Sequence, residues 1–316
     1  MILNNILKNK SSFKTPWLVS YITITIIAQF FLINFKEEFD TINPETFTLF
    51  GAPDTVDIYK GQYWGVFTNN FIHIYWKQLL INLIGLWLFG AFIERRSGRF
   101  KLFFLIIFSS IIPSLWQLTL TAEPGIGLSG VNYALFGFIL SKSRYDKKYR
   151  LKGRYIILIF MISILIYCNY INYFVENIYR TEAMTIGLFL GIVIEKLDYL
   201  KLNLRFLILF SVFLISISTL FYAPWSSEWQ VYKGIKFHES KNFVRAKIYY
   251  RKALKIDRNN QKAIENMNLL KIDELKLKAY KAHVKEKYEV AKKYYLKVLE
   301  IDSTDTWALE NLHELP

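Results

Sequence analysis

Residues 127–137 read GLSGVNYALFG, with a serine set between glycines at the start of an apolar segment that runs to about residue 140. The small residues beside Ser129 let a backbone or a ligand approach its hydroxyl closely. Tyr133 follows four residues later, so on a helix it shares the face of Ser129. Gly130 and Gly137 also share a face, on which a neighbouring helix can pack tightly. A serine here could equally be a helix cap, and the rest of the chain has to decide between the two roles.

The composition favours a membrane protein. The chain has 316 residues, of which 53% are hydrophobic and 17% aromatic, and its formal net charge is +14. So apolar a chain with basic loops is typical of a polytopic membrane protein. The basic residues gather at helix ends and on a helical repeat, so membrane topology explains them and no nucleic-acid partner is expected. The single cysteine, Cys168, excludes a disulfide within the chain.

Seven apolar segments predict an all-α, polytopic helical bundle. They cover about residues 17–35, 72–93, 102–121, 128–141, 155–175, 183–194 and 203–223. No small-residue cleavage site follows the first segment, which is therefore expected to remain as a span. The fourth and sixth segments are short and contain glycine, which is typical of helices inside a bundle beside a polar cavity.

The charged loops predict the orientation of the spans. Residues 94–101 and 141–154 are rich in lysine and arginine, as is the N-terminal segment, whereas residues 36–61 are mainly acidic. The positive-inside rule then places the N-terminus in the cytoplasm, and the 36–70 loop and the C-terminal domain outside. Ser129 would begin the fourth span near its outer end. We expect a multi-pass protein of a bacterial plasma membrane, in contact with the lipid bilayer.

The C-terminal part repeats itself. Residues 246–257, AKIYYRKALKID, recur as AKKYYLKVLEID at 291–302, and AIENM at 263–267 recurs as ALENL at 308–312. Each pair is offset by 45 residues, from 246 to 291 and from 263 to 308. A repeat at this scale predicts stacked helix pairs.

This pattern resembles the tetratricopeptide repeat. The matching positions of the first copy are Gly234, Phe237, Ala246, Tyr250 and Ala253. The family period is about 34 residues, so we expect the extra residues to lengthen one helix, at about 261–284, before a terminal helix at 307–314. The resemblance implies a protein or peptide partner for the repeats, and the alternatives are a passive spacer or a dimer contact. The expected domains are an N-terminal segment 1–16, a membrane domain 17–200, a seventh span and linker 201–225, and repeats 226–316.

The membrane domain resembles the rhomboids, a family of intramembrane serine proteases, over about residues 15–200. Four motifs carry this resemblance, in the order in which the family has them. They are Phe71-Ile72-His73 followed by Asn82, the segment GAFIER at 90–95 with Gly98, the segment GLSG at 127–130 with Tyr133, Ala134 and Gly137, and the glycine pair Gly187 and Gly191. The resemblance implies six core helices, with a seventh added here before the repeats.

A serine–histidine dyad is the mechanism that the resemblance implies. Ser129 would be the nucleophile, supported by Gly127, Gly130 and Tyr133, and a sixth-span histidine would take its proton. Here Met184 stands at that histidine's position, and a thioether cannot carry a proton at neutral pH. Donors from the second span would hold the oxyanion.

Two more positions depart from the family pattern. Asn82 is kept among the oxyanion donors, but Gln78 replaces the family's histidine, and a glutamine amide still donates. Gly65 follows Trp64 where the family usually has arginine, which predicts a looser outer loop. His73 keeps the family's first histidine position, whose expected role is to hold that loop.

These departures favour a pseudoprotease that binds transmembrane or membrane-proximal client proteins, with the repeats recruiting partners. The alternative is an active intramembrane serine endopeptidase that uses Ser129. The third hypothesis is a transporter or lipid-handling protein that shares only the small-residue packing, and the near absence of ionisable residues in the spans argues against it. Scattered histidines and the single cysteine predict neither a metal site nor a cofactor.

Overall fold

The computed structural model describes residues 15–36, 48–73, 75–120, 125–150, 157–159, 161–162 and 182–315. All regular elements in these ranges are helices, and the chain divides into two units, Met1–Ala223 and Pro224–Pro316. The first unit contains α2 (Trp17–Lys36), α4 (Thr55–Tyr59), α5 (Gly65–Thr68), η2 (Asn69–Phe71), α6 (Trp76–Gly85), η3 (Leu86–Gly90), α7 (Ala91–Ser97), α8 (Arg99–Leu120), α9 (Ser129–Lys142), η4 (Lys147–Tyr149), α11 (Glu182–Leu197) and α12 (Leu202–Ser218). The second contains α13 (Ser227–Glu239), α14 (Phe243–Ile256), α15 (Gln261–His283), α16 (Tyr288–Leu299) and α17 (Thr306–His313).

The apolar helices of the first unit follow the predicted spans. Among the described residues, Trp76–Ser97 and Arg99–Leu120 are long and apolar enough to cross a membrane, and shorter apolar helices cover Trp17–Ile33 and Leu202–Ser218. The predicted span at 155–175 lies mostly outside the described residues. The predicted span at 72–93 is shifted to Trp76–Ser97, because Ile72 and Tyr75 have extended backbone and the helix continues to Gly98. Gly98 ends it with a φ of 86°, which favours glycine.

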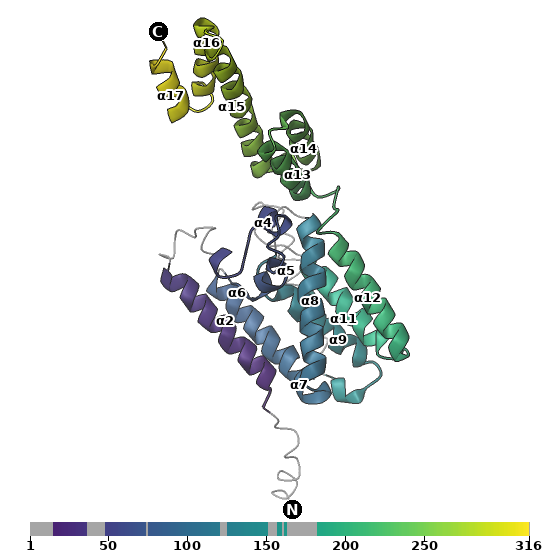
Figure 1. The fold of residues 1–316 in the computed structure, drawn as a ribbon. Coiled ribbons are helices and arrows are strands. Elements are labelled where there is room, and N and C mark those ends of the chain that lie inside the picture. The colour runs from purple at the N-terminus through teal and green to yellow at the C-terminus, as the bar shows by residue number, and fades with distance from the viewer. Residues whose placement is uncertain are drawn as a thin grey trace, which may run out of the picture. The chain divides into compact units, whose positions relative to one another are not determined.

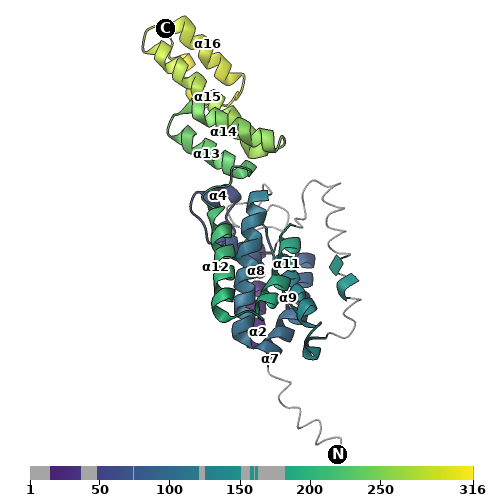
Figure 2. The same ribbon diagram turned by 90° about the vertical axis from the view of Figure 1, so that its right-hand side faces the viewer.

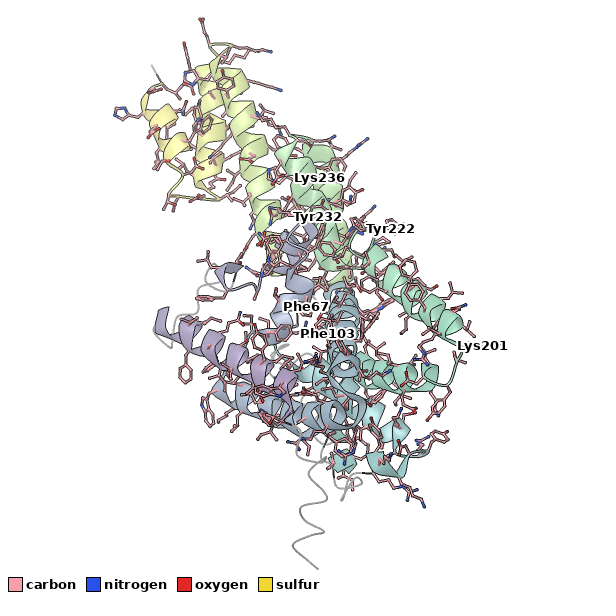
Figure 3. The ribbon with its side chains drawn as sticks, turned by 60° about the horizontal axis from the view of Figure 1, so that its bottom comes forward. Phe67, Phe103, Lys201, Tyr222, Tyr232 and Lys236 are labelled. Atoms are coloured by element: carbon pink, nitrogen blue, oxygen red, sulfur yellow. The ribbon has the colours of Figure 1, made fainter. Side chains whose placement is uncertain are left out.

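Helix α9 lies at the centre of the first unit. From Gly130 to Ile139 every residue of α9 is buried. Helix α9 lies beside α11 in both views, and α8 lies beside α12 (Figures 1 and 2). Lys201 and Tyr222 mark the two ends of the chain segment that forms α12 (Figure 3). The indole of Trp116 on α8 donates to the Ser216 hydroxyl on α12, at 3.2 Å.

Glycines set the distance between α9 and α11. A side-chain carbon on Gly187 would overlap the carbonyl oxygen of Gly130, and one on Gly191 would overlap that of Ala134. A side-chain carbon on Gly137 would likewise overlap the carbonyl oxygen of Leu188. The helices therefore pack backbone against backbone, the close approach that small residues allow inside a membrane.

Charged groups tie the helices together at the end of the bundle where α11 meets α12. Asp198, in the turn between them, lies 2.5 Å from the Lys101 amine of α8 and 3.3 Å from the Arg205 guanidinium of α12. Lys142 of α9 is 3.7 Å from the same carboxylate. Nearby, the fully buried Glu195 of α11 accepts a hydrogen bond of 2.5 Å from Ser141 of α9. One carboxylate thus joins four helices, and Glu195 adds a second link between α9 and α11.

The second unit repeats its packing with the offset found in the sequence. The His238 ring contacts Tyr250 edge-on, and the corresponding pair, His283 and Tyr295, does the same. Both tyrosines are fully buried, and burial raises the pKa of their hydroxyls, so they stay protonated at neutral pH. Each tyrosine anchors one helix pair.

The long helix α15 accounts for the unusual repeat length. Its start is capped by Asn260, which accepts from the Ala263 amide at 2.8 Å, as Asp305 at the start of α17 accepts from Ala308 at 2.9 Å. The first turns of α15 therefore correspond to α17, and its remainder corresponds to α13. Helix α15 spans Gln261–His283, close to the predicted 261–284. The second unit begins at Pro224, whose carbonyl accepts from the Gln230 amide at 2.7 Å.

Replacing Gly191 by alanine should destabilise the first unit by about 1–3 kcal/mol, because the added methyl would overlap the Ala134 carbonyl. Thermal unfolding of the full chain in detergent micelles measures the effect. Val193→Ala is the matched control, since Val193 lies on the same helix with 45% of its surface exposed. Equal unfolding temperatures for the two variants would contradict the close packing of α9 on α11.

Candidate functional site

Ser129 is the first residue of α9, and a tight loop delivers the chain to it. Gly127 has a φ of 96°, a backbone conformation that favours glycine, and its amide donates to the Asn69 carbonyl at 3.0 Å. Leu128 is fully buried, whereas Ser129 stays partly exposed. Ser129 thus lies at the N-terminal end of α9, where the first amides of a helix have no partners within the helix itself.

Two side-chain amides converge on this loop from α6. The Gln78 amide donates to the Ile126 carbonyl at 3.0 Å. A side-chain carbon on Gly127 would lie 2.8 Å from Gln78 Nε2 and 3.2 Å from Asn82 Nδ2. The structure therefore brings Gln78, Asn82 and the residue two before Ser129 together, and it explains the glycine at 127. The space beside Gly127 is bordered by N–H donors, which is the chemistry that a carbonyl oxygen requires.

A chain of hydrogen bonds orients the Asn82 amide. The Phe71 carbonyl can only accept, so the His73 ring donates to it from Nδ1, at 3.2 Å. His73 Nε2 then accepts from Asn82 Nδ2 at 3.1 Å. On the other side, the Asn132 amide donates to Asn82 Oδ1 at 3.2 Å. Both nitrogens of His73 are thus engaged, and in the described part of the chain its ring is not bonded to Ser129.

Sequence reasoning had not identified Asn132. Its side chain is 4% exposed and also donates to the Asn82 backbone carbonyl, at 2.9 Å. The signal was present, because an amide inside an apolar span needs a polar partner and therefore marks a specific contact. Asn132 lies three residues after Ser129, so it faces the same side of α9 as the candidate site.

Met184, which the resemblance to rhomboids places at the position of the dyad histidine, lies in the first turn of α11. It is 8% exposed and belongs to the same apolar cluster as Tyr133. The Tyr133 hydroxyl donates to the Met161 carbonyl at 2.6 Å. In the part of the chain that the structure describes, no histidine or carboxylate hydrogen-bonds to the Ser129 hydroxyl.

The loop that precedes α6 is held by polar contacts around α5 and η2. The Asn70 amide donates to the Ser110 carbonyl at 3.3 Å and to the Ser114 hydroxyl at 3.0 Å, both on α8. The Thr68 hydroxyl donates to the Gly51 carbonyl. Gly65 is buried, and a side chain there would overlap the Pro53 ring. The glycine at 65 is thus explained by packing, and these bonds anchor the loop without an arginine at this position.

In the ranges described above, histidine, cysteine and carboxylate side chains form no group of three or more that could hold a metal ion.

His73→Ala should destabilise the first unit by about 1–3 kcal/mol, because it leaves the buried Asn82 amide without its partner. Chemical or thermal unfolding of the full chain in detergent would measure the loss. Lys77→Ala is the control, since Lys77 is exposed and lies close by in the sequence. If both variants unfold alike, the chain of hydrogen bonds through His73 does not contribute to stability.

Comparison with known proteins agrees with this architecture. A family model described as the rhomboid domain matches residues 60–201, and one described as the tetratricopeptide repeat matches residues 237–260 and 285–305. Over 150 residues the chain is 31% identical to Rhomboid protease GluP of Bacillus subtilis. The aligned region covers 46% of this chain and 29% of that protein. Over 151 residues it is 27% identical to Rhomboid protease GlpG of Salmonella paratyphi A. This aligned region covers 47% of this chain and 53% of that protein.

The match to Rhomboid protease GlpG of Salmonella newport has the same identity and coverage, 27% over 151 residues. The chain spans about half, or less, of the length of these curated relatives. Its rhomboid match ends where α12 begins, and its repeat matches fall within the second unit. Residues 60–201 of this chain therefore match a rhomboid domain, and tetratricopeptide repeats follow it at 237–260 and 285–305.

Proposed function

We propose that this protein is a rhomboid pseudoprotease, which binds transmembrane or membrane-proximal client proteins without cleaving them. The observation that carries the proposal is Met184, a buried thioether at the position of the dyad histidine. His73 does not substitute for it, since both of its ring nitrogens are engaged by Phe71 and Asn82. Without a base, attack by serine loses several orders of magnitude in rate.

Retained donors beside Ser129 support client binding. The amides of Gln78 and Asn82 border Gly127, and Ser129 is partly exposed at the start of α9. A carbonyl of an unwound client segment would accept from these donors, as a substrate carbonyl would in a protease. The tetratricopeptide repeats would recruit the client or an adaptor, since repeats of this kind generally bind proteins or peptides. By the positive-inside rule, the N-terminus would lie in the cytoplasm and the repeats outside.

The second candidate function is an active intramembrane serine endopeptidase. It is favoured by the names of the relatives, which are proteases, and by the retained serine and amide donors. Catalysis would then need a base from elsewhere or slow attack by the un-ionised hydroxyl. The two functions differ in one measurable property, the reactivity of Ser129.

Met184→His should create the missing base and raise cleavage of a single-span rhomboid substrate by at least about a thousandfold. The assay uses the full chain in detergent or liposomes, with gel-resolved product and labelling of Ser129 by a fluorophosphonate probe. Met184→Gln is the matched control, because it is polar and similar in size but cannot accept the proton. Ser129→Ala in the histidine variant should remove the gain.

The outcome that would overturn the proposal is simple. If the wild-type chain cleaves the substrate, and Ser129→Ala abolishes that cleavage, the protein is a protease. If neither wild type nor Met184→His cleaves the substrate, the double variant Met184→His/Gln78→His is the next test, because it restores both histidines of the family. Continued inactivity of this double variant would show that the geometry around Ser129 is not retained.

Client binding is tested separately from catalysis. A fluorescent single-span peptide should bind wild type within about threefold of its affinity for the inactive double variant Met184→His/Ser129→Ala, because neither change removes the amide donors. Fluorescence anisotropy in detergent micelles measures this affinity, and a peptide of scrambled sequence serves as the control. Equal binding of the scrambled peptide, or no binding to wild type, would contradict a client-binding role.

A further inference from the structure

A cavity lies where the start of α2 meets the turn between α7 and α8. Figure 1 shows the first turn of α2 beside α7. The cavity has a volume of about 360 Å³, within the range of sites that bind small molecules. The residues that line it are Thr15, Trp17, Glu94, Arg95, Gly98 and Arg99. None of them belongs to the candidate site around Ser129.

The carboxylate in this cavity is already engaged. Glu94 is 9% exposed, and its two oxygens accept from the backbone amides of Leu18 and Val19, at 2.9 and 3.0 Å. These amides belong to the first turn of α2, whose helix dipole favours a negative charge at this end. The Glu94 charge is thus offset by α2.

The two arginines keep their charge available. Arg95 and Arg99 are exposed, and among the described residues neither forms an ion pair with a carboxylate. Arg99 lies over the Phe100 ring at 5.3 Å, a weak contact that leaves its N–H groups open. Two guanidinium groups at one cavity favour an anion, and their planar donors match the oxygens of a phosphate.

The cavity lies where the headgroups of a membrane spanned by these helices would be. It is formed at the ends of three apolar helices, namely α2, Trp76–Ser97 and α8. Trp17, the first residue of α2, is 73% exposed at this end, and tryptophan is typical of the interface between lipid and water. A side-chain carbon on Gly98 would meet nothing within 4 Å, so this wall of the cavity is open.

We propose that this cavity binds the phosphate of an anionic phospholipid headgroup through Arg95 and Arg99, with Trp17 packing on the lipid. A lipid is favoured over free phosphate because the cavity adjoins the apolar surface of α2, where acyl chains lie. A zwitterionic lipid binds more weakly, since its ammonium group meets two positive charges. The proposal rests on the position of the chain in a membrane and not on whether Ser129 is reactive.

The experiment is a titration of the purified full chain in a neutral detergent, followed by native mass spectrometry. The ligands are phosphatidylglycerol, phosphatidylcholine with the same acyl chains, and inorganic phosphate. Arg95→Gln/Arg99→Gln should weaken phosphatidylglycerol binding by about 30-fold. Each charge lost near the membrane surface costs about 1 kcal/mol, and the two costs add. Arg144→Gln/Arg150→Gln removes two exposed arginines that do not line the cavity, and it should leave the affinity within about twofold of wild type.

Three results would overturn the proposal. Equal weakening in both double variants would show a general effect of charge. Binding of phosphatidylcholine as tight as that of phosphatidylglycerol would exclude recognition of an anion. Saturable binding of inorganic phosphate that displaces the lipid would assign the cavity to free phosphate. If the glutamine variant does not fold, Arg95→Lys/Arg99→Lys keeps the charge but loses the planar fork, and it should bind about threefold to tenfold more weakly than wild type.

Discussion

The close contact between α9 and α11 is the constraint on which the rest of the first unit depends. Gly187 and Gly191 bring the backbone of α11 against the carbonyls of Gly130 and Ala134. A larger residue at either position would move the two helices apart. Because Ser129 begins α9 and Met184 lies in the first turns of α11, this contact also sets the surroundings of the candidate nucleophile.

Several buried polar groups of the bundle take their partners from another part of the chain. Asn82 lies between His73 and Asn132, and Glu94 accepts from the start of α2. Glu195 and Asp198 connect α11 to its neighbours at the end away from Ser129. Such contacts specify which helices are adjacent, whereas apolar packing alone would tolerate several arrangements.

The repeat unit is built on a different principle. Its helix pairs are held by buried tyrosines that recur in register, with Tyr250 and Tyr295 each beside a histidine. Capping by Asn260 and Asp305 starts equivalent helices in the two copies. The same offset that is visible in the sequence thus appears in rings, caps and buried side chains, because each repeat solves the same packing problem.

The sequence by itself determined the helices, the repeat offset and the resemblance to rhomboids, since these depend on local periodicity and on motif order. It indicated Gln78 and Asn82 as hydrogen-bond donors, but it did not show that both side-chain amides lie beside Gly127. Only the tertiary structure decided that Asn132 orients Asn82, that Gly65 is required by Pro53, and that Glu94 caps α2 and leaves two arginines at a cavity. The reason is physical: the partner of a buried amide or carboxylate comes from a distant segment, and helical periodicity carries no information about which segment that is.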